Sequence, residues 1–314
     1  MEIKDLIFRY GAVVSRRFYK REKLRFLNGL AKEFQNQGMK LDLKETVKNQ
    51  HKAYNLYVGD ITKTGLIIST YYDTPPKTFN IFKHQAYSPK SDRKAFILSI
   101  LVPFLVIVTI GALYVKYVLN GIWSTNLFSF INLLGIVPLL ILLFFLSHYR
   151  NGIGNRVNFI RNSASIIGCI KLVQSLKPRD KNRIGIAFTD YGCINHYGDD
   201  MLRSLMRNNA DLNTIISLDC IGSDEDTIIL YTKTCNEYIE KVKKNVSQDI
   251  IFYEIDEKDT HYYCLFKNTI VLTSGKIKDG IVTVDKVNTS KDNNIDEEKL
   301  ALAINLLKEL VLQY

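Results

Sequence analysis

The sequence predicts a mixed α/β domain, with a largely parallel central sheet and helices on both faces, interrupted by a two-helix transmembrane hairpin. Candidate strands alternate with candidate helices in the charged parts of the chain, which is typical of a parallel sheet. Residues 95–115 and 127–147 are apolar runs of 21 residues each, and neither contains Asp, Glu, Lys or Arg. The runs divide the 314 residues into a discontinuous domain, 1–93 and 149–314, and a hairpin, 94–148.

One helix and two strands are expected before the first apolar run. Ser15 is a candidate N-cap for a basic helix that extends to about residue 37, where Gly38 would end it. Residues 55–59 and 66–72 carry the β-branched and aromatic side chains typical of strands, and residues 63–65 form a turn between them.

The part of the chain after the second run supplies the rest of the domain. Helices are expected at 163–176, 197–209 and 295–313, the last begun by an acidic turn. Short strands are expected at 183–189, 214–220, 227–232, 250–255, 269–273 and 280–285. Outside the hairpin the chain is long enough to bury one sizeable core.

Each apolar run is long enough to cross a membrane as a helix, which takes about 20 apolar residues. The basic residues on the far sides of the runs are Lys83, Lys90, Arg93, Lys94, Arg150, Arg156 and Arg161, whereas the linker 116–126 holds only Lys116. This bias places the domain and both ends of the chain in the cytoplasm of a cell-membrane protein with two spans. The first residues show no apolar region of a signal peptide.

Composition agrees with a cytoplasmic domain at a membrane surface. The five cysteines form no C-x-x-C motif and show no paired framework, as expected for reduced thiols. The net charge of +10 indicates attraction to anionic lipid of the inner leaflet, and no nucleic-acid motif accompanies it. In the second run, Asn132 and Gly135 are candidates for helix contact, either within the hairpin or with another membrane subunit.

Five short motifs follow the expected strands and precede the expected helices. They are Tyr71-Tyr-Asp-Thr74, Arg161-Asn-Ser-Ala-Ser165, Phe188-Thr-Asp-Tyr-Gly-Cys193, Ser217-Leu-Asp-Cys-Ile-Gly222 and Asn288-Thr-Ser-Lys-Asp292. In this order the chain resembles the zinc aminopeptidase family, which includes bacterial leucyl aminopeptidases, glutamate carboxypeptidases and glutaminyl cyclases. The resemblance implies that family's fold over nearly all of the chain outside the hairpin.

The residues that the resemblance assigns to the metal site depart from the family's pattern. Asp219 keeps an acidic ligand position, and Asp73 keeps the aspartate that orients a ligand histidine in relatives. The other positions hold Tyr71 and Asn288 for histidines, Arg161 for the bridging aspartate, Cys193 for a glutamate ligand and Gly192 for the general-base glutamate. His261 matches a loop histidine of relatives, where residual ligand recognition and an ordinary surface histidine are both open.

These replacements indicate a pseudopeptidase without catalytic residues, metal ligands or a cofactor. Zinc prefers Cys, His and carboxylate ligands, and a permanent arginine cation would stand where two dications belong. We expect Arg161 to neutralise Asp73, Asp219 or both, because buried carboxylates need partners. A hydrolytic arrangement of Cys193, His196 and Asp190 is the weaker alternative.

The expected function is a membrane-anchored, inactive pseudopeptidase that binds a peptide or a protein, as a subunit of a transporter or peptide-maturation complex. The alternative is an active metallo-aminopeptidase with a single-metal or other non-standard site. A third possibility is a scaffold that acts only through a basic, lipid-facing surface, formed by Arg16, Arg17, Lys20 and Arg21.

Overall fold

A computed structural model describes residues 2–48, 51–78, 83–123, 129–149, 152–193, 195–246, 249–256 and 265–314. The central element is a ten-stranded sheet with the order β1-β2-β5-β3-β6-β9-β10-β4, and β7 pairs with β8 and β9. The strands are β1 (Leu41–Lys48), β2 (His51–Val58), β3 (Leu66–Tyr71), β4 (His84–Gln85), β5 (Ile184–Thr189), β6 (Thr214–Asp219), β7 (Asp226–Thr232), β8 (Ile250–Ile255), β9 (Asn268–Lys278) and β10 (Ile281–Val284).

The middle of the sheet is parallel, because β3 pairs in parallel with β5 and β6, and β6 does so with β9. The outer strands are mostly antiparallel: β1 with β2, β2 with β5, β7 with β9, and β10 with β4 and β9. The carboxyl ends of β3, β5 and β6 therefore meet at one edge, where loops of α/β proteins place their functional groups.

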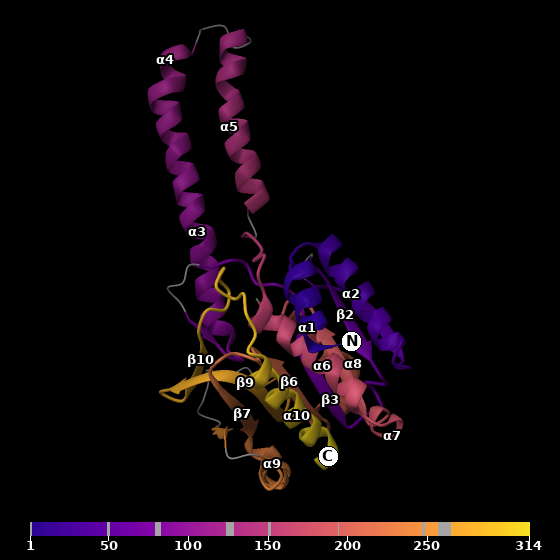
Figure 1. Cartoon of the computed structure of the whole chain (residues 1–314). Coiled ribbons are helices and arrows are strands. Elements are labelled where there is room, and N and C mark those ends of the chain that lie inside the picture. Colours follow the sequence, from indigo (N-terminus) through magenta and orange to yellow (C-terminus); the bar gives the residue numbers. More distant parts are fainter. Residues whose placement is uncertain are drawn as a thin grey trace.

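Helices cover both faces of the sheet (Figure 1). One face packs against α1 (Ile3–Ile7), α2 (Lys20–Gln35), α6 (Ala164–Ser175), α9 (Asn236–Lys243) and α10 (Glu297–Gln313), and the other against α8 (Tyr197–Met206). Side chains alternate across the strands as they should. Leu66 and Ile68 join the first core, whereas Ile67 joins Leu202 and Met206 in the second. Short helical segments complete the domain: η1 (Phe8–Val13), η3 (Phe159–Ser163), α7 (Pro178–Lys181), η4 (Arg207–Asp211) and η5 (Lys233–Cys235).

The structure confirms the predicted fold class and corrects some boundaries. The first long helix begins at Lys20 rather than near Ser15. Ser15 does not cap it, because its hydroxyl donates to the Arg156 carbonyl at 2.7 Å, and the Glu22 carboxylate instead accepts from the amides of Phe18 and Tyr19. Strand β1 was not predicted, since its exposed Leu43 and Val47 and its charges give no buried pattern.

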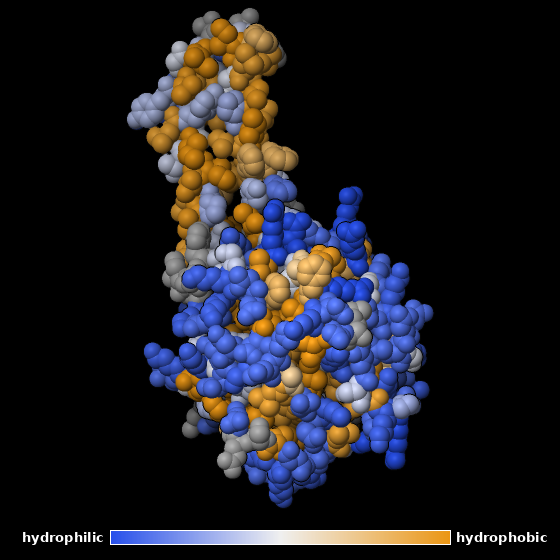
Figure 2. Space-filling model, viewed as in Figure 1, coloured by the Kyte–Doolittle hydropathy of each residue, from blue (hydrophilic) through white to orange (hydrophobic). Residues whose placement is uncertain are grey.

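The hairpin projects from the domain as two long antiparallel helices (Figure 1). The first runs through α3 (Pro89–Tyr114), η2 (Val115–Leu119) and α4 (Asn120–Ile122), and the second is α5 (Phe130–Tyr149). Residues Arg93–Ile122 and Phe130–Tyr149 are long and apolar enough to cross a membrane. Figure 2 shows the apolar hairpin standing out from the largely hydrophilic domain. The first helix continues beyond the expected end at residue 115, so Lys116 lies on the helix rather than in the linker.

Asn132 and Gly135 lie on the face of α5 that contacts the first helix. Both are buried, and the Tyr114 hydroxyl donates to the Gly135 carbonyl at 3.0 Å. A Cβ atom on Gly135 would lie 2.8 Å from Leu119 Cδ1. The structure thus shows contact within the hairpin, and contact with another subunit stays a prediction.

Candidate functional site

The candidate site lies at the carboxyl ends of β3, β5 and β6, beside the start of the helix that follows the hairpin. Tyr71 ends β3, Gly192 and Cys193 follow β5, and Asp219 ends β6. Arg161 lies in η3, the segment that leads into α6. The structure brings these predicted residues around a cavity of only about 10 Å³, which is also lined by His84, Tyr87, Ser88 and His196.

Asp219 is the hub of the site. Its carboxylate accepts hydrogen bonds from the Tyr71 hydroxyl, the Arg161 guanidinium and the Tyr87 amide, the last at 2.9 Å. His84 Nε2 lies 3.2 Å from Oδ2 of the same carboxylate. Burial alone would raise the pKa of Asp219, but Arg161, His84 and the Tyr87 amide hold it well below its usual range. Asp219 is therefore a buried carboxylate that remains ionised.

Arg161 supplies the matching charge. Its side chain is buried, its guanidinium contacts Asp219, and its Cζ lies 4.5 Å from the centre of the Tyr71 ring. Burial lowers the pKa of Arg161, but the Asp219 carboxylate outweighs this and raises it above the ordinary arginine value. The expected neutralisation of Asp219 is thus confirmed as a contact.

Asp73 belongs to a separate part of the site, so Asp219 is the one of the two candidate carboxylates whose contact with Arg161 is described. Its Oδ1 accepts the Gly192 amide at 2.9 Å. Burial raises the pKa of Asp73 to about 7, and the nearby Asp190 carboxylate adds to this, while Lys23 opposes it. Lys23 itself forms a buried ion pair with Asp190. Sequence reasoning missed this lysine, because it lies on a helix that is remote from Asp190 along the chain.

Gly192 packs directly against Tyr71, and a side chain at position 192 has no space. A Cβ atom on Gly192 would overlap the Cβ and Cγ atoms of Tyr71. A glutamate at position 192 therefore has no room while Tyr71 lies where it does.

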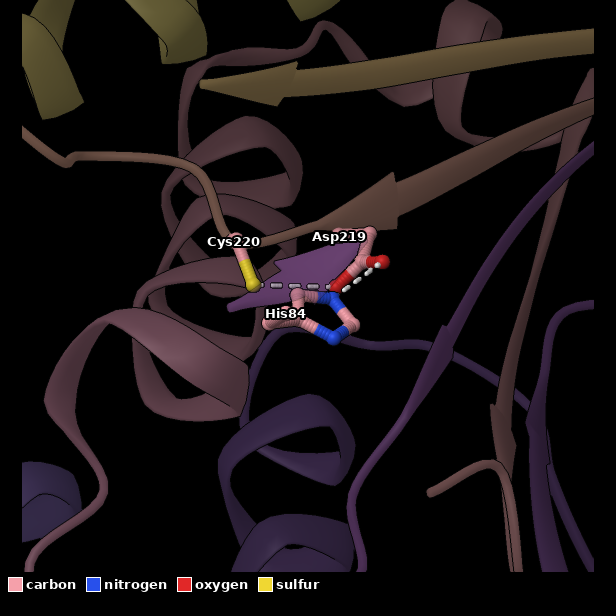
Figure 3. A group of neighbouring side chains, drawn as sticks. All are labelled: His84, Asp219 and Cys220. Carbon is pink, nitrogen blue, oxygen red and sulfur yellow. Dashed lines mark hydrogen bonds and ion pairs between the residues drawn. The ribbon is translucent and has the colours of Figure 1, made fainter. Parts of the chain in front are cut away.

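His84, Asp219 and Cys220 form a compact group that sequence reasoning missed (Figure 3). His84 is 2% exposed and faces Asp219. It enters from the two-residue strand β4, immediately before the hairpin. Such a short strand has no pattern that a sequence could reveal.

These three residue types can bind zinc, and their ligand atoms lie within 4.8 Å of one another. The Arg161 guanidinium, however, already contacts Asp219 and lies 3.7 Å from Cys220 Sγ. Burial, with the adjacent Asp219 charge, raises the pKa of the Cys220 thiol to about 11, so the thiol is protonated in this arrangement. With a cation in place and about 10 Å³ left, the residues present do not fit two zinc ions.

The remaining predicted residues lie near the site but have other contacts. Cys193 Sγ donates to the Asp73 carbonyl at 3.1 Å, and His196 Nδ1 lies 2.8 Å from Asp199. Asp190, the third member of the hydrolytic alternative, is bound by Lys23. Asn288 is buried, and its backbone carbonyl accepts the Thr78 amide at 3.0 Å rather than lining the cavity. His261 lies outside the described residues.

Several of the loop residues named above have strained backbone conformations. Tyr191, His196 and Cys220 each have φ of 56°, and Asn288 has 63°, all in the left-handed region. Such conformations cost about 1–3 kcal/mol for a residue with a side chain and tend to gather at functional sites. The loops of the candidate site therefore combine strained backbone conformations with the side chains described above.

Arg17 corrects one part of the expected basic surface. It is fully buried, and its guanidinium donates to the Tyr72, Tyr10 and Val14 carbonyls. Burial lowers its pKa to about 10. Arg17 is therefore a structural cation that ties the amino-terminal segment to β3, and it cannot face lipid.

No protein-family model and no curated protein sequence matches this chain. Solved structures do. A Zn-dependent exopeptidase from Parabacteroides distasonis is similar at a TM-score of 0.56 with 11% identity, over 98% of this chain and 94% of that one.

Two further structures give the same picture. A glutaminyl cyclase from Tannerella forsythia has a TM-score of 0.54 and 13% identity, over 98% and 95% of the two chains. A leucine aminopeptidase precursor from Bacteroides thetaiotaomicron has a TM-score of 0.52 and 13% identity, over 98% of this chain and 93% of that one. The chain has the fold of the zinc aminopeptidases and glutaminyl cyclases.

Proposed function

We propose that this protein is a membrane-anchored, catalytically inactive pseudopeptidase that binds a peptide or another protein at the cytoplasmic face of the cell membrane. It would act as a subunit of a membrane complex, such as a transporter or a peptide-maturation assembly. The observation that carries the proposal is the Arg161 guanidinium, which is held by Asp219 and Tyr71 inside a nearly filled cavity.

The chemistry of the site supports inactivity. Two-metal hydrolysis needs a bridged pair of ions about 3.5–4 Å apart and a base that takes a proton from the attacking water. Arg161 brings positive charge to the bridging position, and Gly192 offers no base. The nearby Asp219 is neutralised by Arg161, and the Asp73 carboxylate accepts the Gly192 amide. These contacts leave the surrounding residues engaged in holding the domain together.

Because the cavity is nearly filled, we assign binding to the domain surface. A groove of about 480 Å³ lies between β1 and α8, lined by Lys44, Glu45, Val47, Tyr197, Asp200 and Leu205 among others. Strand β1 stands at the end of the sheet order, and it pairs with β2 on one side. An extended peptide can add to such an edge through main-chain hydrogen bonds and place side chains in the adjacent groove.

Metal content and turnover test the inactive site. The full chain, purified in a mild detergent, should hold far less than one zinc per chain. It should neither cleave aminoacyl reporter substrates nor cyclise amino-terminal glutamine. Asp219→Asn should leave any background turnover unchanged. Stoichiometric zinc, together with chelator-sensitive turnover that Asp219→Asn abolishes, would establish the metallo-aminopeptidase alternative instead.

Site-specific cross-linking tests the binding surface. A photoreactive amino acid at Val47 or Leu205, one on each wall of the groove, should capture one and the same partner in cells. The matched control is Leu212, which is 74% exposed and lies outside the groove. Equal capture at Leu212, or different products at the two groove positions, would argue against a peptide-binding groove.

A further inference from the structure

A cavity of about 570 Å³ lies where the hairpin meets the domain. Its walls are apolar side chains of both long helices, namely Ile100, Phe104 and Ile107 of α3 and Leu146 of α5. Lys77 and Thr78, which follow β3, line its domain side. The volume lies within the roughly 300–1,000 Å³ range of small-molecule sites in proteins.

The floor of this cavity is held by backbone contacts. The Lys77 amide donates to the Ile153 carbonyl at 2.7 Å, and Pro76 forms an isolated antiparallel bridge with Gly154. Gly152 has φ of 80°, and a Cβ atom there would lie 3.1 Å from Pro76. The two domain loops therefore present a fixed surface to the base of the hairpin.

Pro103 and Ser99 also line this cavity. Proline has no N–H, so the helical hydrogen bond from residue 103 to the Ser99 carbonyl is not made. The Ser99 hydroxyl donates to the Phe96 carbonyl at 2.7 Å. The cavity thus combines an apolar wall with a hydroxyl-bearing residue and a lysine near the domain.

We propose that this cavity binds one anionic phospholipid from the leaflet that faces the domain. An acyl chain lies against Ile100, Phe104, Ile107 and Leu146, and the phosphate lies at Lys77. The inference rests on the proposed membrane anchoring, because only a membrane-embedded hairpin meets lipid there. Charge complementarity at Lys77 favours lipid over a peptide, and so does the cavity wall, which belongs to helices whose outer surface is apolar (Figure 2).

The test is native mass spectrometry of the full chain, released from nanodiscs with about equal amounts of dioleoyl phosphatidylglycerol and dioleoyl phosphatidylcholine. We expect one retained lipid per chain, enriched about fivefold for phosphatidylglycerol, since a lysine near an anionic surface is worth a factor of this order. Ile107→Trp places a bulky ring in the wall against which the acyl chain would lie, and it should remove the retained lipid. Leu143→Trp, on the same hairpin but outside the cavity, should not.

Lys77→Gln should abolish the preference for phosphatidylglycerol while keeping lipid retention, and Lys63→Gln, remote on the domain, should change neither. A second readout does not depend on the folding of Ile107→Trp. In a Trp123→Phe background, Tyr149→Trp places a tryptophan at the cavity, and brominated phosphatidylglycerol should quench it more than brominated phosphatidylcholine does.

The outcomes separate this inference from the proposed function. Release of the chain from membranes by alkaline carbonate would overturn the anchoring itself. A chain that stays in the membrane but retains lipid equally in Ile107→Trp and Leu143→Trp, or shows equal quenching by the two brominated lipids, would overturn the lipid site alone.

Discussion

Arg161 decides the character of the candidate site, because one side chain supplies the positive charge that Asp219 needs in a buried environment. Burying an ionised carboxylate without a partner is expensive, and an ion pair with additional hydrogen bonds offsets much of that cost. Tyr71 and His84 complete the arrangement by contacting the same carboxylate. The negative charge of Asp219 is therefore balanced by side chains of the protein itself.

We expect Arg161→Met to destabilise the chain by about 3–5 kcal/mol, because it leaves Asp219 charged and buried without its cation. Adding Asp219→Asn should recover most of the loss. Denaturant unfolding of the full chain in detergent measures both effects. Arg183→Met, at an exposed arginine before β5, is the control and should change stability by less than about 0.5 kcal/mol. A double variant no more stable than Arg161→Met would contradict the pairing.

Asp73 predicts a pH dependence of stability. Burial raises the pKa of Asp73 to about 7, so the folded chain keeps a proton that the unfolded chain has released from about pH 4. Stability from this group is therefore full below about pH 4 and is lost as pH rises toward 7. Asp73→Asn, which keeps an oxygen for the Gly192 amide, should remove that loss.

Urea unfolding of the full chain from about pH 4 to 8 measures this effect. The Asp73→Asn variant should gain on the wild type as pH rises, and the gain should level off above about pH 7. Asp279→Asn, in an exposed turn, should run parallel to the wild type throughout. A parallel course for Asp73→Asn as well would show that this carboxyl does not carry the slope.

At the scale of elements, the hairpin is held by close helix packing rather than by charge. The Gly135 carbonyl accepts from Tyr114, and the glycine leaves room for Leu119 of the facing helix. Small residues at such positions let two backbones approach each other.

Gly135→Leu should separate the helices and destabilise the hairpin by about 1–3 kcal/mol, because a side chain there overpacks the contact with Leu119 and Ile122. Gly121→Leu is the matched control, since nothing lies within 4 Å of a Cβ atom at that helical glycine. Thermal unfolding in detergent compares the two. If the two substitutions destabilise the chain equally, the important contact of Gly135 lies outside the hairpin.

The sequence predicted elements well where the pattern was strong. The buried strands β3, β5 and β6 and the two apolar runs were found because most of their side chains are apolar. At the site, Tyr71, Arg161, Gly192 and Asp219 were brought together as the family resemblance implied. His84 and Lys23 were missed, because their partners Asp219 and Asp190 lie far along the chain and only the fold reveals such pairs. Strand β1 was missed because its exposed edge needs no apolar pattern.

At the scale of the whole molecule, the proposed topology makes a direct prediction. Trp123→Cys, at the end of the first long helix, should react in intact cells with a maleimide that does not cross membranes. Lys291→Cys, exposed on the domain, should react only after lysis. Cys169, Cys193, Cys220 and Cys235 are buried, so their background labelling is low. Labelling of Lys291→Cys in intact cells would reverse the orientation.

The position of the hairpin within the chain also orders the assembly of the domain. Strand β3 ends at Tyr71, yet its two neighbours, β5 and β6, begin at Ile184 and Thr214, beyond both long helices. A ribosome therefore completes both apolar helices before either neighbour of β3 exists. The hairpin helices can therefore form while the sheet is still open, and β3 gains its neighbours only afterwards.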